Sequence, residues 1–398
     1  MLNCRLCTSL NIKSVIDFGQ QPIVHNLLQN KDELYEQYSF NLGYCSACGF
    51  LQLIDFIKPE LLYTTYFTIS AWKFQPHVQS LIDHIEYIYH PNHKTKILEI
   101  GCNDGTFITS LNKRGYNNIL GIEPTLNSYL ISKHKGHNVL NKFFDTDLVD
   151  GELTNEKEFD LVITRQVLEH IANLDDFLTS IRCVLKINGG LIIEIPDHSM
   201  NLEMMDYSLW EEHVNYFTKN TLHNLLKIHG FNILHYDTTL FSGRTLICYA
   251  IKCDTSNKTV INKDDTLVMN YINKMPVLRD KIRIHLGNES KNKKLFVYGC
   301  GARSSTLVNF FNFHEFLESY IDDQKEKQGL YVPGSLLKIN PFSQDYLNNS
   351  TFLFGVNTEN EQRVINSKNL SDSDVDIYSI LPPSRLLPKY WVNLVNQF

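Results

Sequence analysis

Residues 96–107 read KILEIGCNDGTF, and this stretch gives the strongest indication of the fold class. An apolar, β-branched run ends in a turn that carries Gly101 and Gly105, and the residues after the turn can begin a helix. A strand, a glycine-rich turn and a helix start let backbone N–H groups approach a nucleotide-like cofactor. The turn lacks the third glycine of a dinucleotide fingerprint, so by itself it is weak evidence; a turn that only packs a helix on a strand is the alternative.

Strand-like and helix-like stretches alternate around this turn. A helical stretch at residues 72–90 precedes it. Three strand-like runs follow, and they lie at the starts of the segments 118–124, 159–171 and 189–197. Such alternation predicts a doubly wound sheet with crossover helices. Two strand-like runs within residues 231–251 could form its antiparallel edge.

The bulk composition favours small-molecule chemistry. The chain has 398 residues, of which 43% are apolar, so it can bury two or three cores. Its net charge of -7 comes from scattered charges, and no basic face for nucleic acid or anionic lipid is evident. No cationic segment leads into an apolar core at the N-terminus, and no apolar run approaches the roughly 18 residues that span a bilayer. We therefore expect a cytoplasmic protein that binds neither nucleic acid nor membrane.

Four of the nine cysteines form two Cys-x-x-Cys pairs, Cys4 with Cys7 and Cys45 with Cys48. Two such pairs can supply four thiolates to a tetrahedral zinc ion, and Gly49 after the second pair is the permissive residue that such a turn uses. Four thiolates fill the coordination sphere, so the zinc would be structural and would not activate water. The alternative is four unrelated free cysteines, which the shared spacing disfavours.

Polar residues after the next two strand-like runs indicate the same cofactor site. Glu123 follows the glycine turn by roughly 20 residues, where a carboxylate can accept both hydroxyls of a ribose. Arg165 and Gln166 end the strand-like run that begins at residue 159, and they would open into the same crevice. NAD and S-adenosylmethionine both fit this geometry, but an acid before a single Gly-x-x-x-Gly turn and the VLEHI segment favour S-adenosylmethionine. The predicted cofactor residues are Glu99, Gly101, Asn103, Asp104, Gly105, Glu123, Arg165 and Gln166.

The stretch SLWEEHVNYFT at residues 208–218 contains a candidate base, His213. A histidine has an intrinsic pKa of about 6.5 and can accept a proton at neutral pH. Glu212 could orient the ring, but only in a turn or irregular loop, because adjacent side chains diverge on a regular strand. The alternative is a histidine that fixes the loop through a backbone hydrogen bond. The position of His213 after a strand of the sheet, on the side where crevice ligands bind, favours the functional interpretation.

Taken together, these motifs resemble the sugar C-methyltransferases, which add a branching methyl group to nucleotide-linked deoxysugars. The resemblance spans nearly the whole chain and is carried by the two cysteine pairs, VIDFGQQPIVHNLL, GCNDGTF, GIEP, VLEHI, EHVNYF and KQGLYVPG. It implies an α/β protein in which a small N-terminal zinc-binding domain precedes a Rossmann-like class I methyltransferase domain and a smaller Rossmann-like C-terminal domain. It also implies a sugar nucleotide held in the cleft between the last two domains.

The resemblance gives each part of the chain an expected place. We expect the zinc-binding domain at residues 1–60, the S-adenosylmethionine-binding domain at 61–254 and a helical connector at 255–293. The C-terminal α/β domain, at 294–398, would contribute to the acceptor cleft. We expect a monomer or a weak homo-oligomer.

The resemblance also implies catalytic residues. In the family a Tyr-His-Glu-His stretch supplies the catalytic machinery, and its last histidine acts as the base. Here the stretch reads Trp210-Glu211-Glu212-His213, so Glu212 and His213 are retained while Trp210 and Glu211 replace the tyrosine and the first histidine. Tyr66 is a further candidate contact of the acceptor. The predicted catalytic residues are therefore His213, Glu212, Tyr66 and Trp210.

One departure from the family concerns the acceptor. Where the family shows His-Gly-Gly-Ser before a strand, this chain has Phe241-Ser242-Gly243-Arg244, which brings an arginine near the expected acceptor site.

The expected reaction is methyl transfer from S-adenosylmethionine to a carbon of a nucleotide-linked keto sugar. Carbon becomes a nucleophile only after it loses a proton, so the site needs a base near the C–H bond and a donor near the developing oxyanion. Methylation of a sugar oxygen or nitrogen, which needs a weaker base, is the alternative reaction. A binding protein that keeps the fold without turnover is the alternative from another class.

Overall fold

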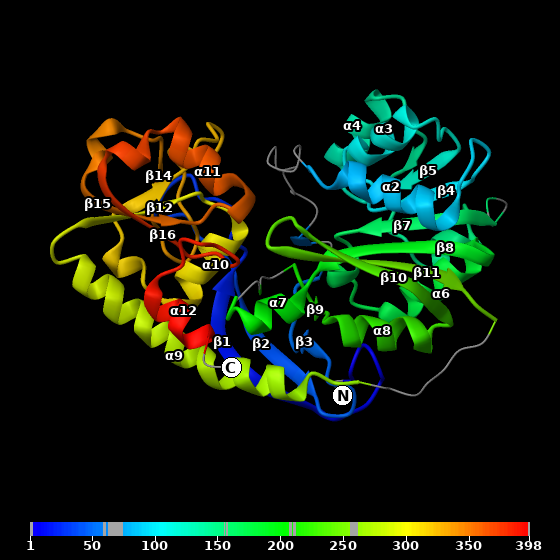
Figure 1. The fold of residues 1–398 in the computed structure, drawn as a ribbon, viewed down its shortest axis with the longest axis horizontal. Helices are drawn as coiled ribbons and strands as arrows, with labels where there is room; N and C mark the ends of the chain where they lie inside the picture. Colours follow the sequence, from blue (N-terminus) through cyan, green and yellow to red (C-terminus); the bar gives the residue numbers. More distant parts are fainter. Residues whose placement is uncertain are drawn as a thin grey trace.

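The computed structural model describes residues 3–58, 61–62, 75–154, 156, 158–206, 209, 212–254 and 262–396. Its strands form three sheets of four, seven and five strands (Figure 1).

The seven-stranded sheet is the one that contains the strand before the glycine turn. Its order is β10-β11-β8-β7-β4-β5-β6. The pairs from β8 through β7, β4 and β5 to β6 are parallel, whereas β11 is antiparallel to both of its neighbours. Because β4 has β5 on one side and β7 on the other, the strand order reverses at β4, and ligands of such sheets bind at the carboxyl ends beside this point. The strands are β4 (Ile97–Ile100), β5 (Ile119–Ile122), β6 (Val139–Leu140), β7 (Phe159–Arg165), β8 (Leu185–Pro196), β10 (Phe231–Leu240) and β11 (Arg244–Lys252).

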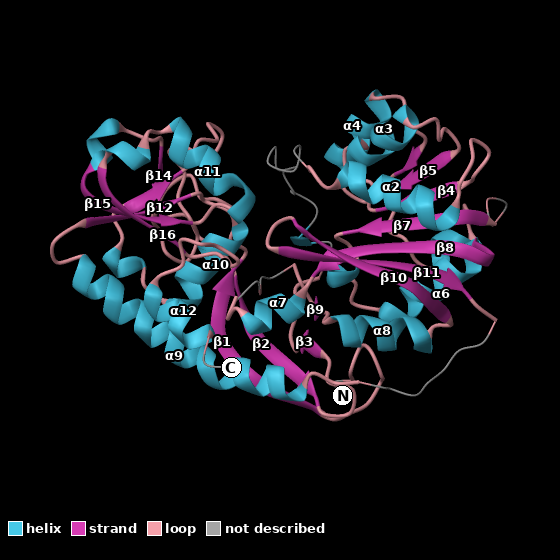
Figure 2. Ribbon diagram, in the orientation of Figure 1, coloured by secondary structure: helices cyan, strands magenta, loops and turns pink. Residues whose placement is uncertain are grey.

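Helices cover both faces of this sheet (Figure 2). On one face, Ile82 and Leu111 belong to a core with the inner residues of β4, β5 and β7. On the other face, Ile181 and Leu225 belong to a second core. The helices are α2 (Val78–Tyr89), α3 (Thr106–Lys113), α4 (Leu126–His134), α5 (Thr146–Asp150), α6 (Leu174–Val184), α7 (His198–Glu203) and α8 (Lys219–Ile228), with a 3-10 turn η2 (Leu168–His170) after β7. The predicted doubly wound sheet with an antiparallel edge is confirmed.

The four-stranded sheet combines the N-terminal segment with a distant piece of chain. Its order is β1-β2-β3-β9, and all three pairings are antiparallel. Strand β9 (Asn215–Tyr216) lies two residues after His213 and pairs with β3 (Leu51–Leu53). The other strands are β1 (Ile12–Pro22) and β2 (Gln37–Cys45). The sheet is therefore not confined to residues 1–60.

The five-stranded sheet forms the predicted smaller C-terminal α/β unit. All its strands are parallel, in the order β14-β13-β12-β15-β16. The strands are β12 (Lys294–Tyr298), β13 (Ser319–Ile321), β14 (Ile339–Asn340), β15 (Asn348–Phe354) and β16 (Asp374–Ser379). The helices are α9 (Asp265–Glu289), α10 (Ala302–Phe311), α11 (Thr358–Ser367) and α12 (Lys389–Val395), with 3-10 turns η3 (His314–Phe316), η4 (Gln344–Leu347) and η5 (Leu370–Asp372).

The N-terminal sheet shares its core with both larger units. Cys45 and Phe50 pack in the core beneath one face of the seven-stranded sheet, whereas Phe40 and Leu42 pack with α9 and the C-terminal unit. In Figure 1, β1 and β2 lie between the seven-stranded and five-stranded sheets. A segment this short depends on neighbouring surfaces for its stability. The domain boundaries at residues 60, 254 and 293 stay predictions.

Candidate active site

A cavity of about 670 Å³ opens at the carboxyl ends of the parallel strands β4, β5, β7 and β8. It is lined by the predicted cofactor residues Glu99, Gly101, Asn103, Asp104, Glu123, Arg165 and Gln166. The remaining predicted residue, Gly105, lies directly before α3. Glu212 and His213 line the same cavity. The predicted cofactor residues and the predicted base therefore share one space.

Each of the two glycines of the turn is required for a steric reason of its own. Both Gly101 and Gly105 have positive φ angles, 74° and 75°, which L side chains rarely adopt. A Cβ atom on Gly101 would lie 2.4 Å from a methyl group of Val167, and one on Gly105 would lie 2.4 Å from the hydroxyl of Ser132. The turn thus keeps its backbone close to the β7 loop. Its N–H groups are used inside the protein, since those of Gly101 and Cys102 donate to the carbonyl of Ile122 and that of Gly105 donates to the carbonyl of Cys102.

Two buried carboxyl groups flank the turn. Glu123 accepts hydrogen bonds from the backbone N–H groups of Asn103 at 2.9 Å and Thr125 at 2.8 Å, which fixes its carboxyl group after β5. Each of its oxygens keeps a lone pair that can accept a ribose hydroxyl. Glu99 is buried, and its Oε2 has no hydrogen-bond partner among the described residues. Burial raises the pKa of Glu99 to about 8. This combination of glycine turn, ribose acceptor and unpartnered carboxyl fits S-adenosylmethionine.

Arg165 and Gln166 lie in the cavity wall but are held by an acid that the sequence analysis missed. Arg165 donates from Nε to Glu194 Oε2 at 2.9 Å, and its guanidinium lies 4.4 Å from the ring centre of Phe107. Burial alone would raise the pKa of Glu194, but Arg165 and His77 lower it to about 2. The signal for this residue was present in the sequence, because an acid within the apolar run LIIEIP needs a buried partner.

His213 is buried and lies beside a second histidine. Its ring centre is 4.8 Å from that of His170, and the two rings meet edge to face. Burial, together with the nearby His170, His198 and Arg303, holds the pKa of His213 well below its usual range. The ring is therefore neutral at neutral pH and has a nitrogen that can accept a proton.

Glu212 is oriented by a residue of the N-terminal segment. Its Oε1 lies 2.8 Å from Nε2 of His25, and its backbone carbonyl accepts a hydrogen bond from Nδ1 of His170 at 2.9 Å. The chain is irregular from Glu212 to Val214, as cooperation between Glu212 and His213 would require. The structure nevertheless pairs the Glu212 carboxylate with His25, a residue that was not predicted and that has no spacing signal in the sequence.

The other positions singled out by the family resemblance fall into two groups. Arg244 lines the cavity, and its Nε donates to Asp197 Oδ2 at 2.6 Å. Tyr66, Trp210 and Glu211 lie outside the described residues.

The four predicted metal ligands come together in the structure. The Sγ atoms of Cys4 and Cys48 are 3.5 Å apart, those of Cys7 and Cys45 are 3.7 Å apart, and all four lie within 4.8 Å of one another. Thiolates bound to one tetrahedral ion at about 2.3 Å would be separated by similar distances. The cysteines fit a structural zinc ion that has no open coordination position.

Arg5, between the first two ligands, connects this metal centre to the His213 segment. Its Nη1 donates to the carbonyl of Val214 at 3.0 Å, and its Nη2 donates to the carbonyl of Leu53 at 2.9 Å. Burial lowers the pKa of Arg5 to about 10, so the group stays charged at neutral pH. The zinc knuckle therefore helps to place the backbone directly after His213.

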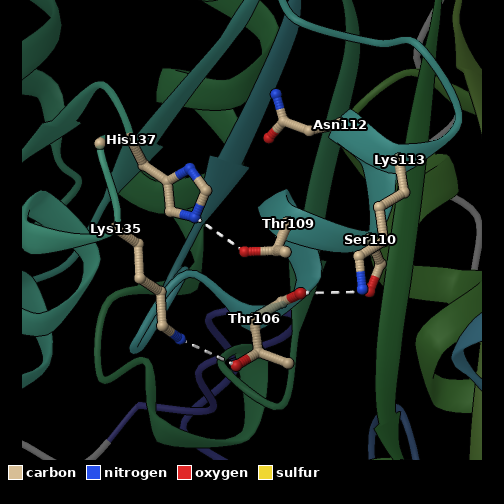
Figure 3. Close-up of a pocket in the computed structure, with 8 residues that line it drawn as sticks. Thr106, Thr109, Ser110, Asn112, Lys113, Lys135 and His137 are labelled. Carbon is tan, nitrogen blue, oxygen red and sulfur yellow. Dashed lines mark hydrogen bonds between the residues drawn. The ribbon is translucent and has the colours of Figure 1, made fainter.

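A second, more open pocket of about 760 Å³ lies beside α3 (Figure 3). In Figure 3, His137 is hydrogen-bonded to Thr109 and Lys135 to Thr106. Lys135 also donates to Asp104 Oδ2 at 2.9 Å, and both Lys135 and Thr106 line the first cavity as well. These residues form part of the wall between the two pockets.

Comparison with known protein families supports the cofactor site and the zinc site. Three family models match successive parts of the chain: a zinc binding domain at residues 4–63, a methyltransferase domain at 71–236 and a C-methyltransferase C-terminal domain at 257–350. The matched domains make the chain an S-adenosylmethionine-dependent methyltransferase. The family resemblance and the two expected cofactors, S-adenosylmethionine and structural zinc, are thereby confirmed.

Individual relatives of this methyltransferase agree. It is 22% identical over 356 residues to the C-methyltransferase NovU of Streptomyces niveus, a match that covers 84% of each chain. It is also 26% identical over 146 residues to a ubiquinone biosynthesis O-methyltransferase of Rickettsia typhi, which covers 36% of this chain and 58% of the relative. The chain thus matches the O-methyltransferase over less than two thirds of that protein's length.

Solved methyltransferase structures match part of the chain. One from Listeria monocytogenes covers 43% of this methyltransferase and 97% of its own chain, with 16% identity and a TM-score of 0.35. A magnesium protoporphyrin IX methyltransferase from Synechocystis covers 44% of this chain and 83% of its own, with 13% identity and a TM-score of 0.36. None of the described helices of the methyltransferase is long and apolar enough to cross a membrane.

Proposed function

We propose that this methyltransferase moves the methyl group of S-adenosylmethionine to a carbon atom of a nucleotide-linked keto sugar, after His213 has removed a proton from that carbon. The observation that carries the proposal is the shared cavity, in which His213 lies in the same space as Glu99, Gly101 and Glu123. The similarity to the C-methyltransferase NovU along most of both chains supports carbon as the methylated atom. The nucleotide-linked acceptor follows from the family resemblance.

The residues divide the work between holding the cofactor and activating the acceptor. When bound, S-adenosylmethionine supplies a methyl group that is open to in-line attack. The glycine turn and Glu123 would hold its adenosyl part, because the glycines let the backbone line the cavity closely and Glu123 offers a fixed carboxyl acceptor. His213, neutral and buried, would take the proton from the carbon beside the ketone.

The test is formation of S-adenosylhomocysteine with TDP-, GDP- and CDP-linked 4-keto sugars, each measured beside the corresponding 4-hydroxy sugar. We expect release with at least one keto sugar and none above background with its hydroxyl partner, because only the ketone makes the neighbouring C–H acidic. Equal release with both sugars would instead favour transfer to oxygen. Absence of release with every sugar, while S-adenosylmethionine still binds, would leave a binding protein.

A further inference from the structure

Glu169 is a buried acid of the active-site cavity that has no role in proton removal by His213. It lies in η2, lines the cavity, and is 2% exposed. Neither of its carboxyl oxygens has a hydrogen-bond partner among the described residues. Burying a polar group without a partner costs free energy, so a carboxyl group in this position is expected to have a ligand or a chemical task.

Two histidines lie close to Glu169. One ligand atom from each of Glu169, His170 and His213 lies within 4.8 Å of the others, and Glu169 Oε1 is 4.0 Å from His170 Nε2. His170 donates its Nδ1 proton to the carbonyl of Glu212, which can only accept. In the neutral ring Nε2 therefore carries no proton, so the Glu169 carboxyl faces an acceptor and is favoured in its protonated form.

The surrounding charges act in the same direction. Glu194 on β8 is held as an anion by Arg165, and Glu212 before β9 is paired with His25. Burial first, and then the charges of Glu194 and Glu212, raise the pKa of Glu169 to about 8, against an opposing contribution from its own backbone N–H. At neutral pH Glu169 is therefore mainly a neutral acid that can donate a proton.

We propose that Glu169 is the general acid of the reaction, which donates its carboxyl proton to the ketone oxygen of the acceptor while His213 takes the proton from the neighbouring carbon. This inference rests on the proposed function. It supplies the donor that a developing oxyanion needs, and a neutral carboxyl group in an apolar site is suited to that role.

The step conserves atoms and charge. The C–H bond breaks, its proton goes to His213, and its electron pair forms the carbon–carbon double bond of the enol. The electron pair of the carbonyl double bond moves to oxygen, which takes the proton of Glu169. One imidazolium and one carboxylate replace two neutral groups, so the net charge of the buried site does not change. When the enol carbon attacks the methyl group, the methyl–sulfur bond would break, its electron pair would stay on sulfur, and the hydroxyl proton would return to Glu169. His213 then releases its proton to water, which regenerates both neutral groups.

The first experiment compares Glu169→Ala and Glu169→Gln with wild type under saturating substrate across pH 6–10. Wild-type kcat should fall as the pH rises through about 8, because ionised Glu169 can no longer donate. We expect Glu169→Ala to lower kcat on the order of 10²-fold while binding of S-adenosylmethionine persists. We expect a smaller loss in Glu169→Gln, and no fall near pH 8, because the amide donates at every pH. The matched control is Glu361→Gln, a buried acid of α11 whose pKa burial also raises, and it should keep the wild-type profile.

The second experiment needs no acceptor, so its outcome is independent of the proposed function. A wild-type minus Glu169→Gln infrared difference spectrum should show a protonated carboxyl band at pH 7 that disappears as the pH rises through about 8. A band absent at pH 7 would overturn the proposal, as would kcat of Glu169→Ala within a few-fold of wild type. Metal analysis gives a further test. If the wild-type protein holds a second divalent ion besides the zinc, and Glu169→Ala loses that second ion, then Glu169, His170 and His213 form a cation site instead. Failure of every keto sugar to react with wild type would contradict the proposed function alone.

Discussion

In a His213→Ala variant, kcat is expected to fall by about 10²- to 10⁴-fold, while the affinity for S-adenosylmethionine stays near that of wild type. The loss follows because alanine cannot take the proton that makes the acceptor carbon a nucleophile. The affinity persists because the glycine turn and Glu123 come from other strands and are fixed by their own backbone hydrogen bonds. Release of S-adenosylhomocysteine measures the first quantity, and calorimetric titration of the cofactor measures the second.

The pH dependence of kcat tests the role of His213 independently. Because the pKa of His213 lies well below its usual range, the ring stays unprotonated as the pH falls through about 6.5. Wild-type kcat should therefore hold down to that pH and fall only at more acidic values. His223→Ala, which changes a partly buried histidine of α8 outside the cavity, is the control and should keep wild-type kcat. Turnover of His213→Ala within a few-fold of wild type would refute the base assignment.

The second large effect is expected from removal of two zinc ligands. In a Cys45→Ala, Cys48→Ala variant the remaining two thiolates cannot hold the ion, and structural zinc contributes on the order of 10 kcal/mol in small zinc domains. Both cysteines are also buried in the core beneath the seven-stranded sheet. We expect loss of zinc by metal analysis and a large fall in the thermal midpoint.

Loss of zinc should also lower the activity of the active site. Arg5 lies between two ligands and holds the carbonyl of Val214, the residue after His213. Turnover should therefore drop even at temperatures where the seven-stranded sheet stays folded, as shown by retained binding of S-adenosylmethionine. Cys183→Ala removes an exposed cysteine outside the zinc cluster and is the matched control. One zinc per chain in the double variant would contradict the four-thiolate site.

The sequence predicted the local parts of this architecture well. The strand at residues 97–100, the glycine turn and the acid after β5 lie close together in the chain, and periodicity and turn chemistry are sufficient to identify them. The cysteine pairs carry their own spacing signal. Seven of the eight predicted cofactor residues line the cavity, because the carboxyl ends of neighbouring parallel strands meet at one edge of the sheet.

What escaped prediction depends on contacts between distant segments. A strand of two residues, β9, has no periodicity, so its pairing with β3 cannot be derived from sequence. The pairing of His25 with Glu212 joins residues far apart in the chain and removes Glu212 from a simple role as the partner of His213. Glu169 was hidden within VLEHI, where nothing distinguishes a buried, unpartnered acid from a solvated one.

The most direct test of the account is the position of the new methyl group. The methyltransferase is incubated with S-adenosylmethionine labelled with carbon-13 in its methyl group and with the keto sugar that gives turnover, and the product is examined by proton–carbon correlation NMR. We predict a methyl signal in the carbon-bound region, coupled to the carbon beside the former ketone. A methyl signal in the oxygen-bound or nitrogen-bound region would contradict the account.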